Sequence, residues 1–228
     1  MSSTTAEAPR DKRFLLARAE SRALEWIAAR LPARVMPDHL TALGVAAAAA
    51  IAAAYALSGH STAWLWAASG LLVVHWLGDS LDGTLARVRR IERPRYGYYL
   101  DHLVDAVAKA LIGLGLGLSP FLLMTTGLVI VIAYLVLSIN TYLETQVLGV
   151  FSLGYGRVGP TEARLALVGL NTAMALGVPV TFAVAGVTLS VLDAVALAVA
   201  TLMLAGLAVR AARNLRTLAL REPAAVPR

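Results

Sequence analysis

The sequence contains no cysteine and little charge, and both absences limit what the chain can be. Without cysteine there are no disulfides, thiolate nucleophiles or cysteine metal sites, although the cellular compartment stays open. Charged residues make up 15% of the chain, against roughly 25% in an ordinary soluble domain. Hydrophobic residues make up 58%, and the mean hydropathy is +0.70. The composition therefore predicts an integral membrane protein, and 228 residues accommodate about six spanning helices in one domain.

Arginine and lysine residues gather in four clusters, and Lys109 alone lies apart from them. The clusters occupy residues 10–34, 87–95, 157 together with 164, and 210–228. Under the positive-inside rule they mark the cytoplasmic side of the membrane. The loops near residues 58–61, 117–120 and 186–190 contain no basic residue, so an even number of spans with both termini in the cytoplasm is expected. Nucleic-acid binding would also suit a net charge of +6, but these arginines flank apolar spans and would meet anionic lipid headgroups there.

The expected fold class is an all-α integral membrane protein with six transmembrane helices and an N-terminal amphipathic interfacial helix. Residues 1–9 lack the apolar segment of a cleaved signal peptide. The pattern of residues 11–31 predicts an amphipathic helix in the cytoplasmic interface, or alternatively an ordinary helix packed on the domain. We therefore expect a cytoplasmic segment at 1–35, a membrane domain at 36–215 and a cytoplasmic tail at 216–228. The spans are expected at residues 40–57, 62–88, 98–118, 121–148, 160–183 and 191–209.

Four aspartates stand within the apolar sequence of the second and third predicted spans, with small residues and an arginine at helical spacing beside them. If each half of this segment is a helix, its two aspartates fall on one face. Two such helices, joined by the basic turn at 88–96, would direct all four carboxylates into one cleft. The two glycines of the set leave room for backbone or ligand to approach closely. The set consists of Asp79, Asp82, Gly83, Ala86, Arg87, Gly97, Asp101 and Asp105.

Four converging carboxylates cannot all stay ionised without a cation, because like charges at short range force a proton onto one of them. Hard carboxylate oxygens, with no cysteine and no paired histidines, favour magnesium, manganese or calcium over zinc. The structural alternative is that the aspartates are buried in pairs with Arg87, Lys109 and neighbouring arginines. Ionisable residues within a membrane are costly and usually functional, which favours a metal site. His102 lies off the acidic face and is expected to pack between helices, and His75 at most supports the aspartates.

The pattern D-x2-D-G-x2-A-R-x9-G-x3-D-x3-D, from Asp79 to Asp105, resembles the signature of the CDP-alcohol phosphotransferase family, membrane enzymes of phospholipid synthesis. The resemblance implies transfer of a phospho-alcohol group from a CDP-linked donor to a hydroxyl acceptor, with release of CMP and dependence on Mg²⁺ or Mn²⁺. It implies that Asp79, Asp82 and Asp101 are the principal metal ligands. Asp105 would be the general base and also contact a metal. A homodimer is implied as well.

The same resemblance assigns substrate binding to further residues. Gly83, Ala86, Arg87 and Gly97 belong to the signature, and Arg87 would hold a phosphate. Pro37 and Thr41 resemble the family's proline-asparagine-x-x-threonine entry to the first span, near the nucleotide site. Asp38 replaces the asparagine of that element, and the other interpretation of Asp38 is a helix N-cap.

Residues near the fifth predicted span are the candidates for acceptor binding. Arg157 and Arg164 would bind an acceptor phosphate, or else serve only as positive-inside anchors. Glu162 follows Pro160 at a predicted helix start, where a negative charge interacts favourably with the helix dipole. The Gly-Pro-Thr-Glu element that contains Glu162 is similar to a segment of the choline and ethanolamine phosphotransferase branch.

The expected donor is CDP-diacylglycerol, with a small polar alcohol as acceptor. The alternative is the amino-alcohol branch, which uses CDP-choline or CDP-ethanolamine with diacylglycerol, and Asp101 followed by His102 is similar to that branch. A cation-coupled transporter is the alternative of another class. It would place its carboxylates near the membrane midplane between repeated halves, whereas here they lie toward one side and no repeat is visible. We therefore expect a multi-pass enzyme of the cell membrane with its active site on the cytoplasmic side.

Overall fold

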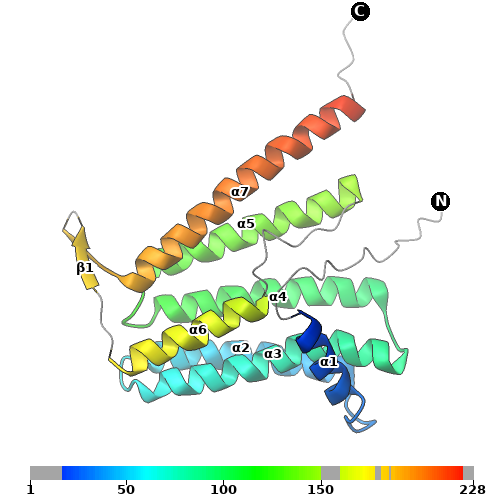
Figure 1. Ribbon diagram of the computed structural model, residues 1–228, viewed down its shortest axis with the longest axis horizontal. Helices are drawn as coiled ribbons and strands as arrows, with labels where there is room; N and C mark the ends of the chain where they lie inside the picture. The colour runs from blue at the N-terminus through cyan, green and yellow to red at the C-terminus, as the bar shows by residue number, and fades with distance from the viewer. Residues whose placement is uncertain (1–16, 150–159, 178–180, 185, 223–228) are drawn as a thin grey trace, which may run out of the picture.

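The computed structural model describes residues 17–149, 160–177, 181–184 and 186–222, and this part of the chain is helical apart from one short hairpin (Figure 1). The helices are α1 (Ala17–Ala28), α2 (Pro37–Leu57), α3 (Ala63–Arg89), α4 (Pro94–Gly117), α5 (Met124–Leu148), α6 (Pro160–Ala175) and α7 (Val191–Arg221). Strands β1 (Thr181–Val184) and β2 (Val187–Ser190) pair antiparallel, with Phe182 opposite Leu189.

The first four predicted spans agree closely with helices α2 to α5, but the last two do not. Helix α7 starts at residue 191 as expected and continues to Arg221, beyond the expected end at residue 209. The fifth span differs in its fold as well. That span was expected to run from residue 160 to 183, whereas α6 ends at Ala175 and residues 181–184 form β1 instead. Gly177 has a φ of 72°, a left-handed conformation that commonly terminates helices, and Pro179 follows it in the sequence. The prediction of a continuous helix to residue 183 was therefore wrong. Apolar composition alone does not show where a glycine will end a helix.

Three helices of the described chain, namely α2, α5 and α7, are long and apolar enough to cross a membrane. Helices α3 and α4 have 27 and 24 residues and carry the four aspartates and the one arginine of the signature. Helix α6 has 16 residues, which at a rise of 1.5 Å per residue is about 24 Å, less than the ~30 Å of a hydrocarbon core. The protein is thus helical with several apolar helices of membrane length, and the count of six spans stays a prediction.

The N-terminal helix packs on the bundle. Within the predicted range 11–31, the described helix is α1, which buries Leu24 and Ala28 against Leu40 of α2 and Leu81 and Leu85 of α3. The loop from α1 to α2 is held by Arg89, which donates hydrogen bonds to the carbonyl oxygens of Leu31, Pro32 and Val35. This packing agrees with the alternative of a helix docked on the domain, and a position in the membrane interface stays a prediction.

Helix α2 packs against both α3 and α4, the two helices that carry the signature. Its backbone touches that of α3 at Gly44 and Gly78, where a Cβ on Gly78 would lie 2.6 Å from the Gly44 nitrogen. Only glycine permits this approach, which brings Asp79, the next residue of α3, beside α2. Further along, Tyr55 donates a 3.0 Å hydrogen bond to Asn171 of α6, whose amide donates in turn to Ser69 of α3.

Helices α5 and α7 run side by side away from the group of α2, α3 and α4 (Figure 1). Their shared face contains the buried Glu144, which pairs with Arg210 and accepts a hydrogen bond from Asn214. At the start of α7, Ser190 is the N-cap, and Asp193 completes a capping box with it. Asp193 also accepts a 2.9 Å hydrogen bond from the backbone nitrogen of Leu123. Polar contacts therefore join α5 and α7 at the start of both helices and again at Glu144 and Arg210.

Candidate active site

A small pocket opens where α2, α3 and α4 meet, and it contains the first half of the acidic signature. Both halves of the signature are helical, as predicted, with Asp79 and Asp82 on α3 and Asp101 and Asp105 on α4. The pocket has both polar and apolar walls. It is lined by Thr41, Gly44, Val45, His75, Asp79, Asp82, Val104 and Ala108.

Asp82 is held from two directions. The hydroxyl of Thr41 donates a 2.6 Å hydrogen bond to Asp82 Oδ2, and the backbone nitrogen of Gly83 donates one of 2.6 Å to Oδ1. Thr41 is buried on α2, and its only sequence signal was the likeness of its segment to a family element. The structure therefore brings a residue of the first predicted span into contact with the signature.

Asp38, which occupies the asparagine position of that element, does not cap α2. The helix begins at Pro37, so the N-cap position is Met36. The Met36 side chain accepts no capping hydrogen bond. Asp38 lies in the first turn and pairs with Arg93, the residue before α4. The N-cap interpretation of Asp38 was therefore wrong, because Pro37 starts the helix one residue earlier.

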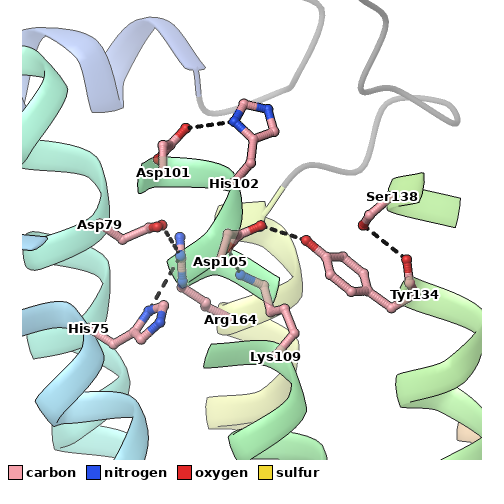
Figure 2. Close-up of polar contacts among 9 residues, drawn as sticks. All are labelled: His75, Asp79, Asp101, His102, Asp105, Lys109, Tyr134, Ser138 and Arg164. Carbon is pink, nitrogen blue, oxygen red and sulfur yellow. Dashed lines mark hydrogen bonds and ion pairs between the residues drawn. The ribbon is translucent and has the colours of Figure 1, made fainter. Parts of the chain in front are cut away.

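Asp79 forms an ion pair with Arg164 of α6 (Figure 2). The same Arg164 Nη2 lies 3.5 Å from His75 Nδ1, so the guanidinium stands between a carboxylate and an imidazole that are one turn apart on α3. Arg164 is 11% exposed and Asp79 is 22% exposed, so solvent screens this pair only weakly. The structure thus brings one predicted acceptor-binding residue directly to a predicted metal ligand.

Both oxygens of Asp105 are engaged by neighbouring side chains. Lys109, one turn further along α4, pairs with Oδ1, and Tyr134 of α5 donates a 2.5 Å hydrogen bond to Oδ2 (Figure 2). The pairing with Lys109 is the one that the structural alternative proposed. Tyr134 was missed by sequence reasoning. Its only signal was a phenol hydroxyl in an apolar span, which needs a hydrogen-bond partner once it is buried.

The side chain of Asp101 is 43% accessible, more than that of Asp79 at 22% or Asp105 at 28%. His102 Nδ1 lies 3.9 Å from Asp101 Oδ2 and 2.7 Å from the carbonyl oxygen of Tyr98. The imidazole also contacts two aromatic rings, with centroid distances of 4.1 Å to Tyr98 and 4.9 Å to Tyr142 of α5. His102 thus packs between α4 and α5, as expected of it.

The other signature residues lie at the rim. Arg87 is exposed at the end of α3, and its Nη2 donates a 3.1 Å hydrogen bond to Thr84. A Cβ on Gly97 would meet no atom of the described chain within 4 Å, whereas one on Gly83 would meet only the end of Arg87. The remaining candidates are Ala86, half-buried on α3, Glu162, half-buried in the first turn of α6, and Arg157, which lies outside the described residues.

The chemistry of these donors fits a hard divalent cation, since all four are carboxylates and the charges of Asp79 and Asp101 both act on Asp82. Across the described ranges, however, no three acidic or histidine side chains are gathered as a metal site requires. Arg164 neutralises Asp79 and Lys109 neutralises Asp105 instead. A cation bound here would therefore take over charges that two basic side chains now balance.

The family model described as CDP-alcohol phosphatidyltransferase matches residues 34–202 of this chain. The matched range includes both halves of the signature, Thr41 of α2 and Arg164 of α6. No curated protein compared with the chain matches it.

Proposed function

Because the chain belongs to the CDP-alcohol phosphatidyltransferase family, whose members are transferases of substituted phosphate groups, we propose that it transfers a phosphatidyl group from CDP-diacylglycerol to a small polar alcohol. The observation that carries the proposal is the pocket in which Thr41 holds Asp82 while Arg164 reaches Asp79. The pocket region brings carboxylates together with the Arg164 guanidinium, a group that can bind phosphate. An ordinary helical bundle has no need of such a pocket within apolar helices.

In this proposal Asp79, Asp82, Asp101 and Asp105 hold Mg²⁺ or Mn²⁺. The ion, when bound, supplies charge that stabilises the donor's diphosphate and the departing CMP. The chain itself supplies the orientation of these ligands. Thr41 fixes the carboxylate plane of Asp82, and the contact between Gly44 and Gly78 fixes α3 against α2.

Asp105 takes the proton of the acceptor hydroxyl. As that proton moves to a carboxylate oxygen, the acceptor oxygen bonds to the phosphorus that carries diacylglycerol, and the bond from this phosphorus to the CMP oxygen breaks. Each carboxylate oxygen has two lone pairs, so Asp105 can accept from the substrate while Tyr134 and Lys109 stay bound. Arg87 and Arg164 would hold phosphate oxygens through their guanidinium groups.

We propose that the site faces the cytoplasm. Arg87, Arg89 and Arg90 stand at the end of α3 nearest the pocket, and the positive-inside rule assigns such an end to the cytoplasm. A homodimer, which the family implies, stays a prediction.

CMP release by the purified protein with Mg²⁺ or Mn²⁺ tests the proposal. One arm supplies CDP-diacylglycerol with a panel of polar alcohols, and the other supplies CDP-choline or CDP-ethanolamine with diacylglycerol. We expect turnover in the first arm and its loss in Asp82→Asn, with the folded protein retained. Turnover confined to the second arm would replace the donor assignment by the amino-alcohol branch. Metal-coupled flux into liposomes without CMP release would replace the enzyme by a transporter.

A further inference from the structure

Glu20 of α1 contacts both helices that form the ion pair between Asp79 and Arg164. Its Oε1 accepts a 2.7 Å hydrogen bond from the indole nitrogen of Trp76 on α3 and a 2.9 Å hydrogen bond from the hydroxyl of Thr161 on α6. One carboxylate oxygen of the N-terminal helix therefore bridges α3 and α6, two helices that are far apart in the sequence.

This bridge lies one helical turn from the ion pair on each helix. Trp76 precedes Asp79 by three residues on α3, and Thr161 precedes Arg164 by three residues on α6, so each pair lies on neighbouring positions of one helix face. The rotation of the first turn of α6 decides whether the long side chain of Arg164 points toward Asp79. Glu20 fixes that turn through Thr161.

Helix α1 is anchored well enough to serve as a fixed support. Leu24, one turn beyond Glu20 on the same face, is buried against α2 and α3, and Ala28 continues that contact. The following loop is held through the hydrogen bonds that Arg89 of α3 donates to its carbonyl groups. The second half of α1 and the loop after it are therefore held on α2 and α3, and the carboxylate of Glu20 extends from α1 to α6.

We propose that Glu20 is a positioning residue that sets the start of α6 against α3, so that Arg164 meets Asp79 in the active-site pocket. Its effect on turnover rests on the proposed function, whereas its effect on the placement of α6 does not. Hydrogen bonds to a charged acceptor are stronger than those between neutral groups. Removing the Glu20 carboxylate would leave both Trp76 and Thr161 without this acceptor.

The placement of α6 is measured directly by a distance between spin labels. Because the chain has no cysteine, Val73→Cys on α3 and Ala166→Cys on α6, both exposed, give one label on each helix. Pulsed electron paramagnetic resonance on the full chain should give a narrow distance distribution, which broadens or gains a second population in Glu20→Ala. Glu25→Ala, an exposed glutamate on the same helix, is the matched control and should leave the distribution narrow. A distribution unchanged by Glu20→Ala would overturn the proposal.

Activity provides the second readout, in a protein without labels. Glu20→Ala and Thr161→Val should each lower kcat/KM about tenfold, through the acceptor KM more than through kcat, and the double variant should lose little more than either single one. Thr161→Ser keeps the hydroxyl and should restore turnover. Fully additive losses would overturn the coupling. If no CDP-linked donor is turned over but the distances still respond to Glu20, the proposed function fails and the positioning role stands.

Discussion

Thr41 and Asp82 lie 41 residues apart in the chain, and the Thr41 hydroxyl donates a 2.6 Å hydrogen bond to the Asp82 carboxylate. Thr41 also lies 3.3 Å from the carbonyl oxygen of Pro37, one turn back on α2, so its hydroxyl has a defined rotamer. The contact lets a residue of α2 orient a carboxylate on α3. Removing the hydroxyl therefore tests the orientation of Asp82 while its charge is kept.

Replacing Thr41 by valine keeps the shape of the side chain and removes the donor. We expect metal-dependent CMP release to fall about tenfold, because a hydrogen bond to a charged group contributes about 1.5–3 kcal/mol and part of this is recovered by water. Thr41→Ser should keep most of the activity. Full activity in Thr41→Val, measured beside wild type at saturating metal, would show that Asp82 needs no support from α2.

Asp105→Asn should retain donor binding and lose transfer. The amide keeps the size of the side chain and can still accept from Tyr134, but it cannot take a proton from the acceptor. Binding of the CDP-linked donor by calorimetry, next to single-turnover CMP release, distinguishes the two effects. Loss of donor binding in this variant would make Asp105 mainly a metal ligand.

Arg164→Gln should raise the affinity for Mn²⁺ several-fold while lowering turnover. The ion pair with Arg164 competes with a metal for Asp79, and the amide removes the competing charge. Titration of free Mn²⁺ by electron paramagnetic resonance reports the affinity without substrate. Arg93→Gln, which removes an exposed cation paired with Asp38, is the control and should leave the affinity unchanged. Unchanged or weaker binding in Arg164→Gln would mean that Arg164 does not compete for Asp79.

Gly78→Ala should destabilise the protein by about 1–3 kcal/mol, the usual cost of forcing extra atoms into a packed contact. The new methyl group would lie 2.6 Å from the backbone of Gly44. Gly70→Ala on the same helix is the matched control, because a Cβ there meets nothing within 4 Å. Alanine at Gly70 should be neutral or stabilising by up to about 1 kcal/mol through helix propensity. Equal melting temperatures of the two variants in detergent would contradict the close contact.

The sequence predicted the helices of the signature and the residues on their acidic faces. Helical period and the cost of charge in apolar sequence are local properties, and both can be counted along the chain. The end of α6 was mispredicted for the same reason, since composition continued to be apolar through Gly177 to the residues of β1. The left-handed conformation of Gly177 ended the helix although the surrounding sequence stayed apolar.

The partners of the aspartates could not be predicted from the sequence to the same degree. Lys109 stood one turn from Asp105 and was weighed as a partner, but Tyr134 and Arg164 reach the site from other helices. Such contacts depend on how neighbouring helices are rotated about their axes, and periodicity specifies a face without specifying what faces it. Glu20 is a further case, because its partners belong to α3 and α6.

The backbone contact between Gly44 and Gly78 also holds two walls of the pocket together. Helices packed this closely cannot slide past one another without collision, so α2 and α3 act as one rigid unit that carries Thr41, Asp79 and Asp82. Helix α6 also packs on this unit, because Met174 lies in the apolar core with Tyr55 of α2 and Leu72 of α3, and Arg164 adds an ion pair to Asp79. The pocket walls formed by α2 and α3 therefore keep their spacing, and any group bound there meets Thr41, Asp79 and Asp82 at fixed relative positions.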